Sequence, residues 1–456
     1  STPLYSSAAS DVYKRQQQAQ QPMGCLHRFS KTIKVVIIGL LILLLMIPMF
    51  MIENLISERG RTQEEAIDEV SEKWSLAQTI TGPYLNLQYP VVTENNGEKK
   101  VSIKDLILFP DELMVNGQLK TEILKRSIYE VNVYQSELTL KGSFSSEELK
   151  KSRIDMDQLQ FDRAAICLNL TDMRGISEQI SITLGDSVYI FEPGMDNRGI
   201  ANTGVHAIAN LSELKQNKKL PYEIKIKLKG SQSLNFIPLG KTTRVDLKAN
   251  WNTPSFTGNY LPNNRNITEK EFSAQWQVLN LNRNYSQVMA DYNTSNIKDI
   301  ENSSFGVNFK IPVEQYQQSM RSAKYAILII LLTFGVIFFT EIMNKTRIHA
   351  LQYLLVGLAL CLFYSLLLSF SEHIGFNPAY LLSSALTIIL VGGYMFGITK
   401  KKKPSLIMSG LLGILYLYIF VLIQLETFAL LAGSLGLFII LAMVMYFSKK
   451  IDWFNE

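Results

Sequence analysis

The sequence has 456 residues, a formal net charge of +5, a hydrophobic fraction of 47% and a charged fraction of 19%. This length exceeds that of an ordinary single domain, and the composition averages two unlike regions, because charge collects before residue 325 and apolar residues after it. The Lys and Arg residues of the second region stand at the ends of apolar runs, which indicates membrane topology and argues against nucleic-acid binding. The cysteines Cys25, Cys167 and Cys361 lie far apart and exclude a disulfide framework and a Cys-based zinc site.

The N-terminal region predicts a membrane anchor. Residues 1–22 lack periodicity, and their stretch SSAASDVYKRQ is similar to translated cloning-linker sequence, so we expect the native protein to begin at Met23. A basic segment, 23–34, leads into an apolar run at 35–52 that is long enough to span a membrane. A cleaved signal peptide is the alternative, but the run has no small-x-small cleavage site. We therefore predict an uncleaved signal-anchor helix, with 23–34 in the cytoplasm and the next domain outside the membrane.

The next segment, 53–80, predicts an amphipathic juxtamembrane helix. Ala66, Ile67, Val70 and Trp74 recur at helical spacing, and acidic residues occupy the positions between them. We expect this apolar stripe to pack on the domain that follows, and a partner-binding helix is the alternative.

Residues 81–320 predict a large, mostly β periplasmic domain. Several runs rich in Ile, Val, Tyr, Phe and Leu are divided by Gly, Pro and Asn, and some alternate apolar and polar residues cleanly. The predicted strands are 84–92, 128–140, 165–170, 180–191, 222–228, 243–247, 272–279 and 305–312. The segments VYQSELTLKGSF from Val133 and YEIKIKLKGSQSLNF from Tyr222 share a strand followed by Leu-Lys-Gly-Ser, which hints at a duplicated strand unit.

Residues 321–448 predict a bundle of five transmembrane helices. The first two form a helical hairpin, because the polar break 341–349 separates two apolar runs of spanning length. The last apolar run, 405–447, is too long for one crossing and is divided at 424–427. Basic clusters at 345–347, 400–403 and 449–450 fall on one side of this arrangement, so both termini, including the tail 449–456, are predicted to be cytoplasmic.

Long motifs along the chain resemble the CreD family of bacterial inner-membrane proteins. The resemblance is carried by EEAIDEVSEKW, TITGPYL, RSIYEVNVY, TDMRGI, SLNFIPLGKTTRVDLKANWNTPSFTG, NYLPNNRNI and FGVNFKIPVEQYQQSMRSAKYAILIILLTFGVIFF, and by RIHALQYLLVGLALCLFYSLLLSFSEHIGFNPAY. It covers nearly the whole chain after Leu26. It implies a role in cell envelope integrity and stress response, and in some members colicin tolerance and the β-lactam response, but it implies no particular reaction or ligand. Ala350 stands where the family motif leads us to expect Pro, so the helix there is expected to start earlier.

The C-terminal bundle offers two pairs of candidate residues. Glu372 and His373 stand where a span meets the outer surface, and a carboxylate beside an imidazole could relay a proton or bind a metal. Adjacent helical residues point about 100° apart, however, so we favour a structural role, in which the pair ties its span to another span or to the β domain. Arg347 and His349 mark the cytoplasmic interface.

The β domain offers two polar-aromatic loop clusters, one with Asp172 and Arg174 and one with Trp251. They could bind a ligand, and turns with satisfied side chains are the favoured alternative. The outer segment has no HExxH, GxSxG or phosphate-loop motif and a single histidine, His206. We therefore predict no catalytic residues, no metal site and no cofactor.

Three functional classes remain open. We favour a non-enzymatic envelope protein whose β domain contacts an envelope protein partner or a ligand, while the helices contact the lipid bilayer. A transporter or channel is the second class, but the spans hold few charges and no matching pair of Gly/Pro-broken helices. The third class is a membrane enzyme that uses Glu372 and His373.

Overall fold

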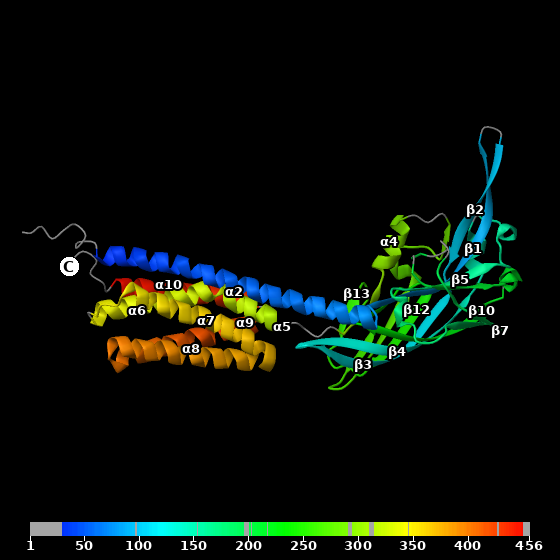
Figure 1. Cartoon of the computed structure of the whole chain (residues 1–456). Helices are drawn as coiled ribbons and strands as arrows, with labels where there is room; N and C mark the ends of the chain where they lie inside the picture. Colours follow the sequence, from blue (N-terminus) through cyan, green and yellow to red (C-terminus); the bar gives the residue numbers. More distant parts are fainter. Residues whose placement is uncertain are drawn as a thin grey trace, which may run out of the picture. The chain divides into compact units, whose positions relative to one another are not determined.

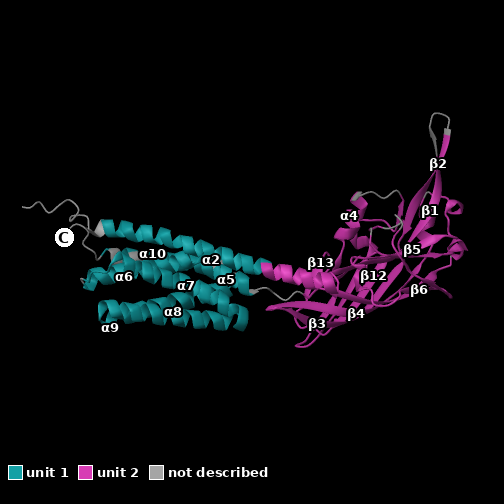
Figure 2. Ribbon diagram, viewed as in Figure 1, with its two compact units in different colours: residues 1–61, 313–456 teal, residues 62–312 magenta. Residues whose placement is uncertain are grey.

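The computed structural model describes residues 30–95, 98–152, 154–195, 200–201, 203–216, 218–290, 294–309, 314–344, 346–425 and 428–449. The chain divides into two compact units (Figure 2): unit 1 comprises residues 1–61 and 313–456, and unit 2 comprises residues 62–312. The predicted segments 1–22 and 23–29, with Cys25, and the tail beyond Lys449 lie outside the described residues. Unit 1 is helical and unit 2 is mostly β (Figure 1), which confirms the predicted fold class of an apolar N-terminal helix, a large β domain and a C-terminal set of apolar helices.

Unit 1 is built from the start of a long N-terminal helix, a short connecting helix and a series of apolar helices. They are α2 (Ser30–Trp74), α5 (Glu314–Lys324), α6 (Ala326–Asn344), α7 (Ala350–Ile374), α8 (Phe376–Thr399), α9 (Lys402–Gln424) and α10 (Ala429–Ser448). Among the described residues, α2, α6, α7, α8 and α9 are long and apolar enough to cross a membrane, and α10 is a further apolar helix of 20 residues. The predicted break at 341–349 separates α6 from α7, and Gly375, at a φ of 78°, separates α7 from α8.

The helix α2 is continuous from Ser30 to Trp74. We expected a span over 35–52 and a separate amphipathic helix ending at residue 80; the structure instead places both on one helix that ends before β1. The buried apolar residues of its first part, Leu45, Met49 and Ile56, lie four and seven residues apart and so share one face. A Cβ added to Gly357 would lie 2.1 Å from the Leu45 side chain, so the missing side chain at Gly357 allows α2 to pack closely on α7.

Unit 2 contains two β-sheets. The first is a 9-stranded sheet that contains β1 (Gln78–Asn95), β2 (Glu98–Leu108), β5 (Ala164–Leu170), β8 (Glu192–Pro193), β9 (Val205–Ala209), β11 (Ser233–Phe236), β13 (Ser255–Gly258), β16 (Val288–Ala290) and β17 (Phe305–Asn308). The second is an 8-stranded sheet that contains β3 (Glu112–Arg126), β4 (Tyr129–Phe144), β6 (Ser181–Leu184), β7 (Ser187–Ile190), β10 (Leu220–Ser231), β12 (Thr242–Ala249), β14 (Asn264–Ile267) and β15 (Phe272–Leu279). Short helices connect the strands: α3 (Glu147–Lys151), α4 (Thr294–Asn302) and the 3-10 turns η1 (Met156–Gln158), η2 (Met173–Gly175), η3 (Ser212–Gln216) and η4 (Asn280–Asn282).

The main hydrophobic core lies between the two sheets. In β10 the residues Tyr222, Ile224, Ile226 and Leu228 are buried in this core while the alternate lysines face outward, as the period of two in the sequence predicts. The strand β5 is buried on both faces, because its alternate residues also enter a second apolar cluster on the other side of the 9-stranded sheet. At β5 the 9-stranded sheet is therefore covered on both faces.

The suspected repeat forms an adjacent antiparallel pair, β4 and β10. Tyr134 of β4 lies opposite Gly230 of β10, and Tyr222 of β10 lies opposite Gly142 of β4. A Cβ at either glycine would lie within 3 Å of the opposing tyrosine hydroxyl. Each copy of the Leu-Lys-Gly-Ser motif thus supplies the glycine over which the tyrosine of the other copy packs.

Several predicted strands differ from those observed. The segment 180–191, predicted as one strand, is the hairpin β6–β7, because Gly185 adopts a φ of 57° and begins a two-residue turn. Of 305–312, only Phe305–Asn308 is a strand, and residues 310–312 are not described. The long strand β3 was not predicted, although Leu113, Val115 and Leu119 alternate with polar residues, because Asn116 and Gly117 interrupt its apolar pattern.

Candidate functional site

The predicted pair Asp172 and Arg174 joins the end of α2 to the β domain within unit 2. Asp172 caps η2 and is 7% exposed; its Oδ2 accepts hydrogen bonds from the Leu76 amide at 2.9 Å and from Ser75 Oγ at 3.3 Å. Arg174 Nε donates to Asp172 Oδ1 at 3.0 Å, and its Nη1 donates to the Glu72 carbonyl of α2 at 2.6 Å. A guanidinium on a C-terminal carbonyl satisfies a group that has no partner within the helix.

The Asp172 junction is completed by Gln78, the first residue of β1. Its Nε2 donates to the Asp172 carbonyl at 2.8 Å, and its Oε1 accepts from the Asp172 amide at 3.2 Å. Burial by itself would raise the pKa of Asp172, but the hydrogen bonds from Arg174 and from the Leu76 amide outweigh it, so this pKa lies below its usual value. The side chains of Asp172, Arg174 and Gln78 are thus hydrogen-bonded within this cluster, which connects the end of α2 to the β domain and acts as a structural joint.

Glu372 and His373 are neighbours on α7, but the structure does not bring their side chains to a common partner. Glu372 Oε1 accepts a hydrogen bond from Tyr316 Oη of α5 at 3.0 Å and lies 4.0 Å from Arg59 Nε of α2; its side chain is 12% exposed. His373 is exposed. Glu372 therefore ties three helices of unit 1 together.

Arg347 and His349 lie at the opposite end of α7, about 35 Å along an ideal helix from Glu372. Arg347 is exposed. His349 caps the helix: its Nδ1 accepts from the Leu351 amide at 3.2 Å, and its own amide donates to Gln352 Oε1 at 3.0 Å. This capping box starts α7 at Ala350, so the expectation of an earlier start was wrong.

A partly buried ion pair near His349 was missed as a site. Lys34 of α2 pairs with Glu341 of α6 and also donates to the Ile348 carbonyl at 3.1 Å. Tyr353 Oη of α7 donates to Glu341 Oε2 at 3.1 Å. The sequence shows Glu341 at a helix end, but it does not reveal that three helices meet there.

Trp251 lies apart from Asp172 in unit 2. Its ring packs against the main core, and its Nε1 donates to the Thr253 carbonyl at 3.0 Å, within its own loop. The geometry is that of a turn with a satisfied side chain.

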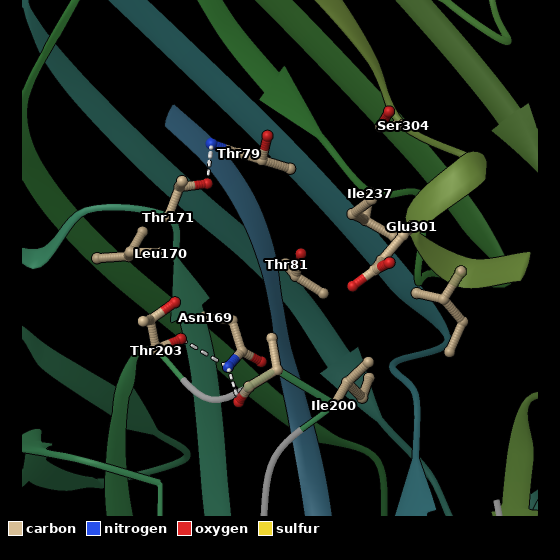
Figure 3. Close-up of a pocket in the computed structure, with 12 residues that line it drawn as sticks. Thr79, Thr81, Asn169, Leu170, Thr171, Ile200, Thr203, Ile237, Glu301 and Ser304 are labelled. Carbon is tan, nitrogen blue, oxygen red and sulfur yellow. Dashed lines mark hydrogen bonds between the residues drawn. The ribbon is translucent and has the colours of Figure 1, made fainter. Parts of the chain in front are cut away.

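A pocket of about 240 Å³ with mixed polar and apolar lining opens on the face of the 9-stranded sheet that is turned away from the 8-stranded sheet. Figure 3 shows its walls: Thr79 and Thr81 come from β1, Asn169 from the end of β5, and Glu301 from α4. It is also lined by Leu170, Thr171, Ile200, Ala201, Thr203, Ile237, Ile300 and Ser304. Sequence reasoning missed this pocket, because its residues come from distant segments and form no motif.

The floor of the pocket is fixed by a buried hydrogen-bond network. Tyr84 Oη donates to Asn169 Oδ1 at 2.6 Å and accepts from the Ile200 amide at 2.8 Å. Asn169 Nδ2 donates to the carbonyls of Ala201 and Thr203 at 3.0 and 2.8 Å. The wall residues Ile200, Ala201 and Thr203 are therefore held by strands β1 and β5, which gives this side of the pocket a preformed shape.

The described lining of the pocket offers hydrogen-bonding groups and one carboxylate. Its lining contains hydroxyls, one amide and one carboxylate, and neither a histidine nor a cysteine is among the residues that line it. His206, on β9, is buried outside the pocket and bonds the Gly194 carbonyl through Nδ1 at 2.7 Å. Within the described ranges, no group of three His, Cys, Asp or Glu side chains could hold a metal ion.

Comparisons with known proteins cover both units. The family described as "Inner membrane protein CreD" matches residues 30–454. The inner membrane protein CreD of Escherichia coli (strain K12) is 32% identical over 420 residues, which is 91% of this chain and 91% of that protein. Together with the apolar helices of unit 1, these matches identify a multi-pass inner membrane protein. The chain belongs to the CreD family of inner membrane proteins.

Proposed function

We propose that this protein is a non-enzymatic receptor of the bacterial envelope. Unit 2 lies on the periplasmic side and recognises a small polar envelope component in the pocket formed by β1, β5 and α4, and this recognition contributes to envelope integrity and to the response to envelope stress. The termini lie in the cytoplasm, and a further envelope protein contacts the β domain when the pocket is filled.

The observation that carries the proposal is the set of uncommitted polar groups in a preformed pocket. Glu301 makes no side-chain hydrogen bond or ion pair with any residue that the structure describes, and the same holds for the Thr81 hydroxyl. Glu301 is exposed and Thr81 is half-buried, so both side chains are accessible to a ligand in the pocket. By contrast, the candidate residues Asp172, Arg174 and Glu372 are engaged in contacts between elements.

The pocket is tested by filling it. Thr81→Phe places an aromatic ring in the pocket, and the matched control Thr183→Phe adds the same ring at an exposed position of β6. In a strain that lacks the gene, we expect Thr81→Phe to fail to restore resistance to envelope stress and the control to restore it. Membrane abundance and melting temperature are measured for both. Full restoration by Thr81→Phe at normal abundance would contradict the proposal.

The orientation is tested with reporter fusions. An alkaline phosphatase inserted in the exposed turn after Ser127 of unit 2 should be active, because this enzyme needs an oxidising compartment. A fluorescent protein that matures only in the cytoplasm, fused after Lys403, should be bright. The reverse result at either position would contradict the proposed orientation and would leave the proposal about the pocket unaffected.

A further inference from the structure

We infer that the pocket binds a small hydroxylated amine, of the class of amino sugars, with the ammonium group on Glu301. This inference rests on the proposed function and names the ligand of the same site. It follows from the position of one carboxylate, from the hydroxyls that face it and from the apolar wall behind them.

Glu301 lies in the last turn of α4, and this last turn contains no basic residue. The carbonyl ends of a helix carry partial negative charge, so a carboxylate there destabilises the helix and a cation beside it is stabilising. Neither Lys298 nor another cation of the described residues pairs with Glu301. An amine bound at Glu301 would supply the positive charge that this end of α4 lacks.

Several hydroxyl groups line the same pocket as this carboxylate. Figure 3 shows the Glu301 side chain directed toward Thr81, and Thr79 and Ser304 line the same pocket. Thr171 Oγ1 accepts the Thr79 amide at 3.0 Å and can still donate its own proton. Threonine and serine hydroxyls both donate and accept, so they match the hydroxyls of a sugar ring.

The remaining wall sets the size and shape of the ligand. Ile200, Ile237 and Ile300 are buried and offer an apolar surface to the C–H face of a ring. The volume of about 240 Å³ is below the 300–1,000 Å³ of drug-sized pockets. A single ring fits this description, and a long chain does not.

The test uses the full-length protein in detergent at low ionic strength, because the Glu301 carboxylate is exposed and its attraction for a cation is screened by salt. Glucosamine is the probe, and glucose and N-acetylglucosamine, which lack the positive charge, are the matched ligands. Titration calorimetry should show glucosamine binding about tenfold more tightly than either, the ratio expected of one charge-assisted hydrogen bond. Glu301→Gln should reduce glucosamine to the affinity of glucose, whereas Glu269→Gln, at an exposed turn outside the pocket, should change nothing.

Three results separate this inference from the proposed function. If Thr81→Phe abolishes the envelope phenotype but wild-type protein binds glucosamine no better than glucose, the ligand class is wrong and the receptor function stands. The same conclusion follows if Glu301→Gln leaves glucosamine binding unchanged. If Thr81→Phe is silent at full abundance, the receptor function fails, whatever the binding data show.

Discussion

Asp172 illustrates how a single buried carboxylate can hold two elements together. It accepts hydrogen bonds from the Leu76 amide and from Arg174, and it is 7% exposed. Asp172→Asn turns an amide group toward donors, so we expect unit 2 to lose about 1.5–3 kcal/mol of unfolding free energy. Asp157→Asn is the control, because its side chain is 91% exposed, and its effect should stay within about 0.5 kcal/mol. If urea unfolding showed the same loss of unfolding free energy for Asp172→Asn and Asp157→Asn, the proposed role of Asp172 in holding α2 to the β domain would be wrong.

The same residue predicts a response to acid. Because its pKa is lowered in the folded state, ionised Asp172 contributes its full stability above the unfolded-state pKa, about 3.9. That contribution is lost as the pH falls through the lower folded-state pKa. The difference in melting temperature between wild type and Asp172→Asn should therefore be constant near neutrality and shrink below about pH 4. A difference that grows on acidification would have the wrong sign for this account.

Glu372 and His373 should behave differently when each is replaced. Glu372→Gln removes the ion pair with Arg59 and weakens the acceptor for Tyr316, so we expect a lower melting temperature and lower membrane abundance. His373→Asn changes an exposed residue and should leave both unchanged. If both variants kept full abundance but lost the envelope phenotype, a chemical role for the pair would replace the structural one.

At the scale of elements, the same substitution should have opposite effects in a strand and in a helix. A Cβ at Gly142 of β4 would lie 1.8 Å from the Glu112 carbonyl oxygen, which accepts the hydrogen bond of Tyr222. Gly142→Ala should therefore destabilise unit 2 by about 1–3 kcal/mol. Gly60 of α2 has its nearest neighbour at 3.9 Å, so Gly60→Ala should stabilise the helix by about 0.5–1 kcal/mol. Thermal unfolding measures both, and a stable Gly142→Ala variant would show that β4 and β3 separate easily.

The sequence predicts some elements better than others for identifiable reasons. Strands such as β10, with one face buried, carry a period of two, and the apolar helices carry runs of spanning length, so both were found. The strand β3 has the same alternation but is interrupted at Gly117, where Leu247 and Leu138 fill the space of a side chain. The end of α2 was placed too late, because what stops it is the distant Asp172 and Arg174, and no local signal marks that contact.

At the scale of the whole molecule, the sequence identifies charged residues of the sites but not the residues that they contact. Two ion pairs, Lys34–Glu341 and Arg59–Glu372, join α2 to α6 and α7 at positions about 38 Å apart along the helix, which exceeds the hydrocarbon thickness of about 30 Å. The charges could be read from the sequence, but their partners could not. The pocket combines Thr81, Asn169 and Glu301, which only the strand order brings together.

Unit 2 should fold without the membrane helices, and the end of α2 should contribute to its stability. Residues 62–312 contain both sheets, the main core and the partners of Asp172, so this fragment should give a strand-dominated circular dichroism spectrum and one cooperative melt. A fragment of residues 78–312 lacks the Leu76 amide and the Glu72 carbonyl that bind Asp172 and Arg174. Losing these bonds should lower the melting temperature by at least about 4 °C. Equal melting temperatures of the two fragments would show that the end of α2 does not stabilise the domain. If the fragment 62–312 were unfolded, unit 2 would depend on the membrane helices for its stability.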